Sequence, residues 1–454
     1  MEHLIIIGAA AAGTKAAAKA RREDSDLKIT LFTEEEYISY SACGIPFFIG
    51  GEFDDYKQLI EYTPAEFEEE IKAKVYTHHR VLKIKPKSNI IEVGNLISGE
   101  IFEEKYTKLL ISTGASPAKP KMEGLEAKNI FTIRTINDAI AIKKTAKKGK
   151  RAVIIGGGYI GIEMLEAFFK LNLDTKLIEK QKQIMSVLDF EIATNLKEMI
   201  LNERPKSIIT SDSVKRFISN DKNELEKIEL ESGTTIEADL ALIALGVKPN
   251  IELARNAGIQ IGETGAIKVN KHMQTNIANI YAAGDCCEKT SIINQKPVWV
   301  PLGSTANKEG RVAGLNLAGK KAEFEGVLGS AVTKFFDIKI SLTGLSEKAA
   351  EKQGYEVATV TIHSKDKAGY MKDAHPISIK MIADKKTGKL LGAQGIGYGD
   401  VDKRINIIAS AISAKMTVKD YINIDISYAP PFSRAIDITT TAAYKLDKIL
   451  EKST

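Results

Sequence analysis

The sequence predicts an α/β protein with two repeated strand–turn–helix–strand units and a separate α+β domain at its C-terminal end. Three observations support this fold class. A glycine-rich turn between an apolar strand and a helix occurs twice, about 150 residues apart. The chain has 454 residues, more than one hydrophobic core usually serves, so several domains are expected. Beyond about residue 325 the glycine turns stop, and alternating apolar and polar residues indicate antiparallel strands.

The first unit runs from an apolar strand at Leu4–Ile7 through the turn Gly8–Gly13 into a helix that ends near Arg22, and then into a strand at Lys28–Phe32. This order is typical of a Rossmann-like dinucleotide-binding unit. Its glycines allow a tight turn, and a small residue, here Ala10, lets the backbone approach a pyrophosphate at the helix N-terminus. The candidate dinucleotide contacts of this unit are Gly8, Ala10, Gly13, Thr33 and Glu34.

The second unit repeats this order, with a strand at Ala152–Ile155 and a turn at Gly156–Gly161. Two copies in the same setting indicate dinucleotide binding far more strongly than one. Glu179 ends the second strand, where a carboxylate bonds ribose hydroxyls and repels a 2′-phosphate, which favours NADH over NADPH. The neighbouring Lys180 and Lys182 act against this preference, so both nucleotides remain candidates. The candidate contacts of this unit are Gly156, Gly158, Gly161 and Glu179.

One cysteine follows the first unit at the point where a bound dinucleotide would be presented. Pro46 and the apolar residues after it predict a helix that starts just past Cys43. A helix N-terminus lowers the pKa of a thiol, and the thiolate is the form that attacks disulfides and peroxides. No second cysteine follows within five residues. Cys43 is therefore expected to hold a mixed disulfide, a persulfide or a sulfenic acid rather than an internal disulfide.

Later segments complete the predicted architecture. Asp285 stands just beyond an apolar strand, where its carboxylate either receives sugar-alcohol hydroxyls or only caps the turn. The C-terminal domain is expected to contain strands at Lys334–Ser341, Tyr355–His363 and Ile377–Ile382 and a helix near Arg404–Met416.

The composition excludes several function classes. The chain has 64 basic and 59 acidic residues, and its lysines are scattered, so no nucleic-acid partner is expected. Three cysteines are too few for a disulfide framework, which predicts a reducing, cytoplasmic setting. No apolar run reaches about 18 residues, so no membrane span is expected. No metal site is predicted.

Taken in order, these motifs resemble the single-cysteine branch of the pyridine nucleotide-disulfide oxidoreductases. This branch contains coenzyme A-disulfide reductases, NADH oxidases, NADH peroxidases and persulfide reductases. The resemblance covers essentially the whole chain. Its motifs are the two glycine turns, Ser39-x-x-x-Cys43-Gly44, Thr113-Gly114, Glu179, Ala282–Asp285, Asn307–Arg311 and Tyr428–Phe432.

The resemblance implies an FAD-binding domain at 1–117 and 245–324, an NAD(P)H-binding domain at 118–244, and a C-terminal dimerisation domain at 325–454. It implies an enzyme that passes electrons from NADH or NADPH through FAD to Cys43, with Ser39 as a further catalytic residue. It also implies a homodimer in which the tail of one subunit reaches the active site of the other. The additional FAD contacts that it implies are Thr113, Gly114, Asp285 and Phe432.

Departures from the family pattern bear on the electron acceptor. Oxidases and peroxidases of the family carry a histidine where this chain has Ala11, which argues against efficient reduction of oxygen or peroxide. Ser39 agrees with the coenzyme A-disulfide reductases instead. Ala42 and Phe432 replace an asparagine and a tyrosine of those reductases, which weakens the assignment, and Tyr370 falls in a second tyrosine-bearing segment.

Three cations on the first helix resemble the coenzyme A contacts of these reductases in position. Lys15, Lys19 and Arg22 are spaced by four and three residues and share one helix face. They either bind the nucleotide phosphates of coenzyme A or form a solvated basic face. The candidate substrate-binding residues are Lys15, Lys19, Arg22 and Tyr370.

The sequence therefore predicts an FAD-dependent NAD(P)H oxidoreductase that reduces coenzyme A disulfide, or a related persulfide or disulfide, through Cys43. Coenzyme A itself is a further candidate ligand. An NADH oxidase that reduces oxygen is the first alternative. A non-catalytic flavin redox sensor is the alternative from another class.

Overall fold

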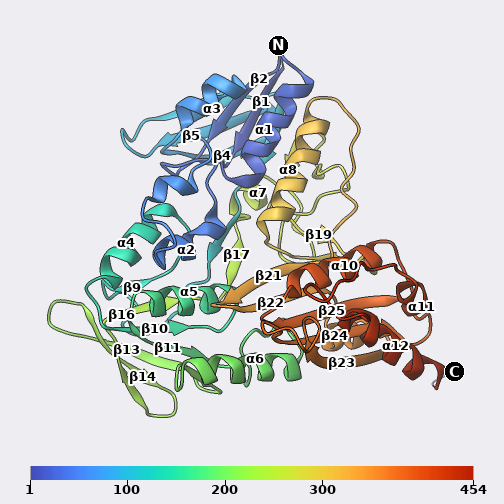
Figure 1. Cartoon of the computed structure of the whole chain (residues 1–454). Coiled ribbons are helices and arrows are strands. Elements are labelled where there is room, and N and C mark those ends of the chain that lie inside the picture. Colours follow the sequence, from blue (N-terminus) through green and yellow to red (C-terminus); the bar gives the residue numbers. More distant parts are fainter. Residues whose placement is uncertain (1, 453–454) are drawn as a thin grey trace.

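The computed structural model describes residues 2–452, and three five-stranded sheets form its framework (Figure 1). The first sheet is parallel, in the order β18-β7-β1-β2-β3. Most of it comes from the N-terminal part of the chain, and β18 joins it from about 170 residues further on. Its strands are β1 (His3–Ile7), β2 (Lys28–Phe32), β3 (Lys74–Tyr76), β7 (Lys108–Ile111) and β18 (Ile280–Ala282).

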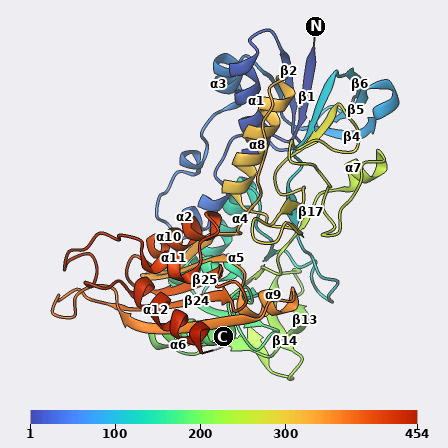
Figure 2. The same cartoon turned by 90° about the vertical axis from the view of Figure 1, so that its right-hand side faces the viewer.

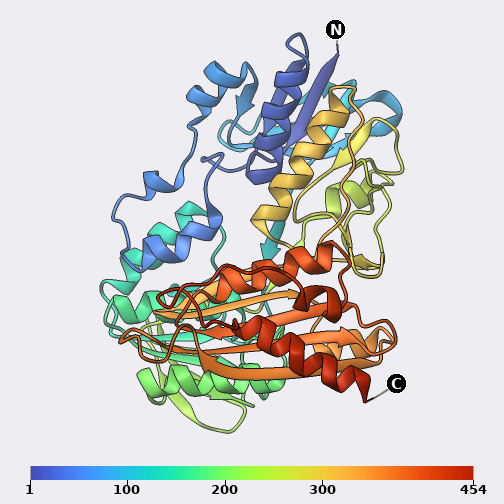
Figure 3. The same ribbon diagram turned by 45° about the vertical axis from the view of Figure 1, so that its right-hand side comes forward.

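Two helices pack side by side beside the first sheet: α1 (Ala11–Glu23) and α8 (Gly303–Leu317) (Figures 1 and 3). Glycines make their contact unusually close. A Cβ at Gly310 would lie 2.4 Å from the Ala12 carbonyl oxygen, and one at Gly314 would lie 2.5 Å from that of Ala16. Because no side chain fits at either position, the two helices meet backbone to backbone.

The second sheet is also parallel, in the order β12-β11-β10-β16-β9, and all its strands fall between β7 and β18 in the sequence. The predicted second unit is confirmed as β10, α5 and β11. The elements of this part are β9 (Ile130–Phe131), α4 (Ile136–Ala146), β10 (Arg151–Ile155), α5 (Tyr159–Lys170), β11 (Asp174–Glu179), α6 (Phe190–Glu203), β12 (Ile208–Thr210) and β16 (Leu240–Ile243).

The third sheet is antiparallel, in the order β21-β22-β25-β24-β23, and helices α10, α11 and α12 pack on it (Figures 2 and 3). It confirms the predicted α+β domain. Its elements are β21 (Ala331–Phe335), β22 (Ile338–Gly344), α9 (Glu347–Lys352), β23 (Val357–Lys365), β24 (Pro376–Asp384), β25 (Leu390–Gly397), α10 (Val401–Ser413), α11 (Val418–Ile422) and α12 (Ile438–Glu451).

One predicted strand of this domain is wrong. The segment Lys334–Ser341 is not one strand but part of the hairpin of β21 and β22, which pairs Phe335 with Ile338. Phe336 lies at the turn with a φ of +50°, a conformation that bulky side chains rarely adopt. Apolar and polar residues alternate on both sides of the turn, and this conceals it although the adjacent Phe335 and Phe336 interrupt the alternation.

The remaining elements form small sheets and short helices around this framework. Among the helices of residues 2–452, none combines the length and the apolar character needed to cross a bilayer. These elements are α2 (Ile45–Ile49), α3 (Pro64–Ile71), β4 (His79–Lys85), β5 (Ile90–Asn95), β6 (Ile101–Lys105), β8 (Ala115–Pro117), β13 (Val214–Ser219), β14 (Leu225–Leu230), β15 (Thr235–Glu237), β17 (Val247–Pro249), α7 (Glu252–Asn256), β19 (Lys289–Thr290) and β20 (Pro297–Val298).

A buried lysine of the third sheet forms ion pairs with carboxylates at the start of α6, in the part of the chain that contains the second unit. Lys380 in β24 is 1% exposed, and its Nζ lies 3.1 Å from Asp189 Oδ2 and 2.5 Å from Glu347 Oε2. It also pairs with Glu191. Burial lowers the pKa of Lys380, but its hydrogen bonds to Glu191 and Glu347 outweigh burial and raise the pKa above the ordinary value. Asp189 is the N-cap residue of α6, so this cation links two parts of the chain.

We expect Lys380→Ala to lower the apparent free energy of unfolding by about 3 kcal/mol, because its removal leaves the buried Asp189 carboxylate without a counterion. The control is Lys386→Ala. Lys386 pairs with Glu356 at 2.9 Å, and both side chains are largely exposed, so its loss is expected to cost less than about 1 kcal/mol. Denaturant unfolding followed by circular dichroism compares the two variants. Equal losses would contradict the role given to Lys380.

Candidate functional site

The first glycine turn is tight because its glycines touch neighbouring backbone. Gly8 has a φ of +102°, and a Cβ there would lie 2.3 Å from the Ser112 carbonyl oxygen. A Cβ at Gly13 would lie 2.0 Å from the Gly8 carbonyl oxygen. Ala10 is the N-cap residue of α1 and has extended backbone. The turn therefore brings β1 against the start of α1 with room only for hydrogen at Gly8 and Gly13.

The second glycine turn repeats this geometry and adds one open position. A Cβ at Gly156 would lie 2.4 Å from the Ala244 carbonyl oxygen, and one at Gly161 would lie 2.0 Å from that of Gly156. Gly158, the N-cap residue of α5, is different, since a Cβ there would meet no atom within 4 Å. The fold itself therefore leaves space at Gly158, which suits the close approach of a pyrophosphate to the helix N-terminus.

Glu179 lies at the second turn, as the sequence predicts. Its Oε2 accepts a hydrogen bond from the Gly157 N–H at 2.8 Å, and its Oε1 accepts one from the Gln181 N–H at 2.8 Å. The carboxylate at the end of β11 is thus fixed beside the glycines. This is the position from which an acidic side chain bonds a nucleotide ribose.

The first unit lacks the equivalent arrangement. Thr33 is buried, and its hydroxyl accepts a hydrogen bond from the Glu35 N–H at 3.3 Å. Glu34 is exposed and pairs with Arg80 at 2.5 Å. Neither side chain bonds to the first turn in the way that Glu179 bonds to the second.

Asp285 carries an unsatisfied oxygen at the edge of the first sheet. Its Oδ1 is buried and has no hydrogen-bond partner within residues 2–452. Its Oδ2 lies 3.7 Å from Arg134 Nη2, and a Cβ at Gly114 would lie 3.0 Å from the same nitrogen. A buried carboxylate oxygen without a partner is costly unless a ligand supplies the donor. The residues present therefore fit the sugar-alcohol hydroxyls of FAD. Sequence reasoning missed Arg134, which lies in no recognised motif.

Cys43 lies between the first turn and the start of α8. It belongs to the short 3₁₀ turn Ala42–Gly44 just before α2, so the predicted helix past the cysteine is confirmed. Its Sγ lies 3.8 Å from the place of a Cβ at Gly303, the first residue of α8. Ser39 has a φ of +46°, and its N–H donates to the Ala9 carbonyl at 2.9 Å. The structure thus brings the Ser39–Cys43 segment, the first turn and α8 together.

The predicted lowering of the Cys43 pKa is wrong for the chain itself. Burial of the sulfur raises the pKa of Cys43, although part of the residue is exposed, and the nearby Glu163 and Asp285 raise it further. Arg134 opposes them without outweighing them. The helix that follows Cys43, α2, has only five residues, so its dipole is too weak to offset burial and two carboxylates.

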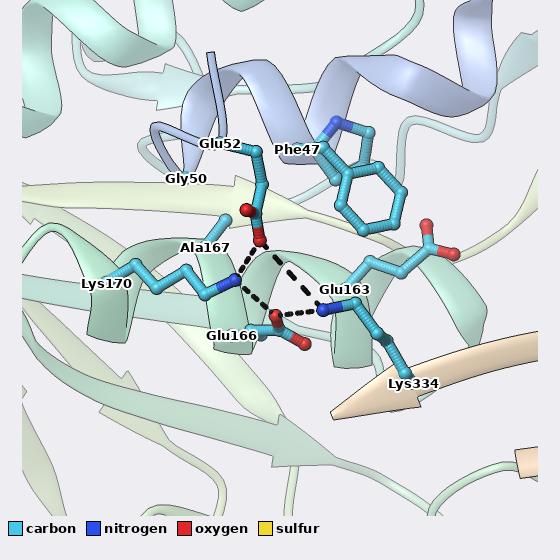
Figure 4. A pocket seen from close by; sticks show the side chains of 9 residues that line it. Phe47, Gly50, Glu52, Glu163, Glu166, Ala167, Lys170 and Lys334 are labelled. Atoms are coloured by element: carbon cyan, nitrogen blue, oxygen red, sulfur yellow. Dashed lines mark hydrogen bonds and ion pairs between the residues drawn. The ribbon is translucent and has the colours of Figure 1, made fainter. Parts of the chain in front are cut away.

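A small pocket next to helix α2 is lined by residues from α2, α5 and β21 (Figure 4). Glu166 in α5 lies 2.7 Å from Lys170 and 3.0 Å from Lys334 of β21, and Lys170 also pairs with Glu52 just after α2. Glu163, one helical turn earlier, accepts a hydrogen bond from the Thr333 hydroxyl at 2.9 Å. Burial raises the pKa of Glu163. The carboxyl group that acts on Cys43 is therefore held from the third sheet.

The proposed substrate-binding residues lie apart from one another. Lys15, Lys19 and Arg22 follow one side of α1, where Lys19 pairs with Glu23 at 2.5 Å and Arg22 is exposed. Tyr370 lies in the C-terminal domain and is 75% exposed.

Phe432, proposed as an FAD contact, is also in the C-terminal domain and is 74% exposed. The structure does not bury either aromatic ring within the single chain. Thr113, by contrast, donates its hydroxyl to the Asn250 carbonyl at 2.8 Å, at the end of β7.

We expect Glu163→Gln to speed alkylation of Cys43 at pH 8 by about two- to five-fold in the FAD-free chain, because losing this charge lowers the thiol pKa and raises the thiolate fraction. Glu52→Gln is the control. It removes a carboxylate from the same pocket, but Glu52 is not among the charged groups that shift the pKa of Cys43. Iodoacetamide kinetics with peptide mass mapping give the rate, and Cys286 and Cys287 are fully buried. An equal gain in both variants would exclude a specific effect of Glu163.

Comparison with known proteins identifies the family of the chain. The model of the pyridine nucleotide-disulphide oxidoreductases matches residues 2–310, and the model of their dimerisation domain matches residues 330–439. The chain is 37% identical to a CoA-dependent NAD(P)H sulfur oxidoreductase of Pyrococcus furiosus, over 96% of each chain. It is 30% identical to a coenzyme A disulfide reductase of Staphylococcus haemolyticus, over 98% of this chain and 99% of the relative.

A solved structure shows the same fold. The NAD-dependent persulfide reductase of A. fulgidus superposes with a TM-score of 0.95 at 36% identity, over 99% of this chain and 84% of that one. Proteins of this kind use FAD and NAD(P)H, and the partnerless oxygen of Asp285 and the two glycine turns fit both groups. The chain belongs to the pyridine nucleotide-disulphide oxidoreductase family.

Proposed function

We propose that this enzyme reduces coenzyme A disulfide, or a coenzyme A persulfide, through Cys43. The observation that carries the proposal is the setting of this sulfur. Cys43 is the exposed cysteine of the chain, beside the first turn and the N-terminus of α8. Cys286 and Cys287 are fully buried elsewhere, so Cys43 has no partner for an internal disulfide. A thiol in this position exchanges with a small disulfide from outside.

We assign the residues of the site to cofactor binding and to sulfur chemistry. Gly8, Ala10, Gly13, Thr113, Gly114 and Asp285 hold FAD, and Gly156, Gly158, Gly161 and Glu179 hold NADH or NADPH. When bound, FAD supplies the transfer of electrons from the nicotinamide to sulfur. Cys43 attacks one sulfur of the substrate disulfide, the sulfur–sulfur bond breaks, and the first coenzyme A leaves as a thiol after taking up a proton. The second thiol leaves when two electrons reduce the Cys43–sulfur bond.

Two features favour a coenzyme A compound as the acceptor. The relatives include a CoA-dependent NAD(P)H sulfur oxidoreductase and a coenzyme A disulfide reductase. On α1, Lys15 and Arg22 make no ion pair with any described residue, so their charges are available to nucleotide phosphates. The neighbouring Arg21 is different, because it bonds backbone carbonyls such as that of Leu27.

An NADH oxidase is the second candidate function. Ala11 at the start of α1 speaks against it, because it offers no side chain that could exchange protons near Cys43. Oxygen uptake without release of thiol, measured under NADH with coenzyme A disulfide present, would favour the oxidase. Turnover below about one per minute with every acceptor would favour a flavin redox sensor, since typical enzymes run at about 1–1000 per second.

The active assembly is proposed to be a cytoplasmic homodimer. Residues 330–439 match a dimerisation domain, and three aromatic side chains of this domain are exposed in the single chain: Tyr370, Tyr428 and Phe432. Exposed aromatic groups of this kind are typical of protein interfaces. We propose that they cover the Cys43 site of the partner subunit, with Tyr370 contacting substrate and Phe432 near the flavin. The three free cysteines suit a reducing compartment.

We expect the native protein to lose mass when it is treated with a reductant, because Cys43 stores a sulfur cap. Native mass spectrometry distinguishes the caps: about 765 Da for coenzyme A, about 32 Da for a persulfide sulfur and about 16 Da for a sulfenic acid.

Cys43→Ser is expected to keep FAD and its reduction by NADH but to lose at least about 1000-fold in disulfide turnover. Full turnover by this variant would overturn the proposed role of Cys43.

We also expect Arg22→Ala to raise the KM for coenzyme A disulfide about ten-fold with little change in kcat, because a phosphate contact binds substrate and transition state alike. The matched control is Lys348→Ala, which removes an exposed cation from helix α9 of the C-terminal domain. Steady-state kinetics at several salt concentrations make the comparison. An unchanged KM for Arg22→Ala would assign the α1 cations to a solvated face.

A further inference from the structure

Two buried ionisable side chains lie behind the turn that carries Asp285. Glu309 falls within the Asn307–Arg311 motif, which predicted no role for it, and Lys289 lies in no motif. Glu309 in α8 is 0% exposed and Lys289 in β19 is 1% exposed, with Oε2 and Nζ 3.6 Å apart. Neither side chain reaches solvent. Their contacts are with the turn itself.

These side chains and one tryptophan hold the polar backbone groups of the turn. The Gly284 N–H donates to Glu309 Oε2 at 2.7 Å, and Lys289 Nζ donates to the Gly284 carbonyl at 2.6 Å. Trp299 Nε1 donates to the Asp285 carbonyl at 2.8 Å. Gly284 has a φ of +90°, and its turn packs against α1. With its backbone fixed in this way, the turn holds Asp285 Oδ1 as a buried oxygen that has no partner within residues 2–452, and Glu309 Oε1 is likewise buried without one.

We infer that Glu309, Lys289 and Trp299 are positioning residues for FAD, which fix the Gly284–Asp285 turn so that Asp285 is set in place before the cofactor binds. A carboxylate that is already ordered gives up less conformational entropy on binding. The inference concerns FAD alone and does not depend on which disulfide the enzyme reduces.

A purely structural ion pair is the competing explanation, and the chain offers a matched control for it. Arg404 and Asp437 form a buried pair in the C-terminal domain, 2.8 Å apart and 7% and 8% exposed. Buried pairs contribute little to stability on balance, but loss of one partner destabilises the fold. Asp437→Asn and Glu309→Gln each replace one buried carboxyl group by an amide with little change of shape.

The test measures FAD affinity without using turnover. Each holoenzyme is diluted stepwise, and the emission of Trp299, the one tryptophan of the chain, is followed together with the fluorescence of released FAD. At pH 9, above the pKa of about 8 that burial gives Glu309, we expect the dissociation constant for FAD to rise about ten-fold in Glu309→Gln, because a charge-assisted hydrogen bond to the turn is lost. Asp437→Asn should lower the melting temperature and leave the dissociation constant unchanged.

A pH profile separates positioning from simple stability. Burial raises the pKa of Glu309 to about 8, so its carboxylate forms as the pH passes this value and strengthens its bonds to Gly284 and Lys289. FAD affinity of the unmodified protein should rise about three-fold from pH 7 to pH 9, and Glu309→Gln should show no such rise.

The other groups facing Glu309 are Asp285, Cys286, Cys287 and Lys289. Among them, the hydrogen bond from Cys287 lowers the pKa of Cys286 to about 7. Because Cys286 also titrates near the pH range of this profile, Cys286→Ser serves as a control, and this variant should keep the rise in FAD affinity.

Two results would overturn the inference. One is a dissociation constant within two-fold of the unmodified value for Glu309→Gln, accompanied by a loss of melting temperature like that of Asp437→Asn. The other is a pH rise that persists in Glu309→Gln. If Glu309→Gln does not fold, Trp299→Phe tests the same turn, since it removes the donor to the Asp285 carbonyl. Free-flavin fluorescence should then show an FAD dissociation constant about three-fold higher, and an unchanged value would also overturn the inference.

Discussion

The close contact of α1 and α8 is the constraint on which the site depends. Gly310 and Gly314 allow the two helices to approach until backbone touches backbone, and even one methyl group at either position would overlap a carbonyl oxygen. Helix α1 begins at the first glycine turn, and α8 begins at Gly303, beside the Cys43 sulfur. The separation of the helices therefore sets the distance between the first glycine turn and the Cys43 sulfur. Glu309 lies one residue before the first of these glycines, so the same contact also places the Asp285 turn.

The charges around Cys43 come from separate parts of the fold, and each is held by its own partner. Thr333 of the third sheet bonds Glu163, while Arg134 lies beside Asp285. Burial and these two carboxylates keep the thiol in its neutral form, which reacts slowly. The protein scaffold alone therefore protects the sulfur from indiscriminate attack. An increase in its reactivity must come from groups that bind at the site.

The sequence predicted those parts of the fold that short segments determine. The order of strand, glycine turn and helix predicted β1 with α1 and β10 with α5, and the position of Glu179 followed from its place after β11. Arg134 and Lys289 lie in no motif, and the role of Glu309 within the Asn307–Arg311 motif could not be predicted, because pattern spacing does not report contacts between separate segments. The Cys43 pKa was predicted with the wrong sign for a related reason, since the nearby helix is visible in the sequence and the distant carboxylates are not.

The C-terminal domain joins two kinds of contact that differ in chemistry. Toward the rest of its own chain it packs apolar side chains such as Phe335 into a shared core and adds polar contacts: Lys380 binds the carboxylates around α6, and Thr333 and Lys334 bind Glu163 and Glu166 of α5. Its loops instead expose aromatic rings, including those of Tyr370 and Phe432. Polar contacts fix orientation, whereas exposed aromatic area favours association with another surface. The residues that bind α5 and the exposed rings belong to one sheet and its loops. Association of two subunits through these rings would therefore also fix α5. It would fix with α5 the carboxyl group of Glu163, which raises the pKa of Cys43.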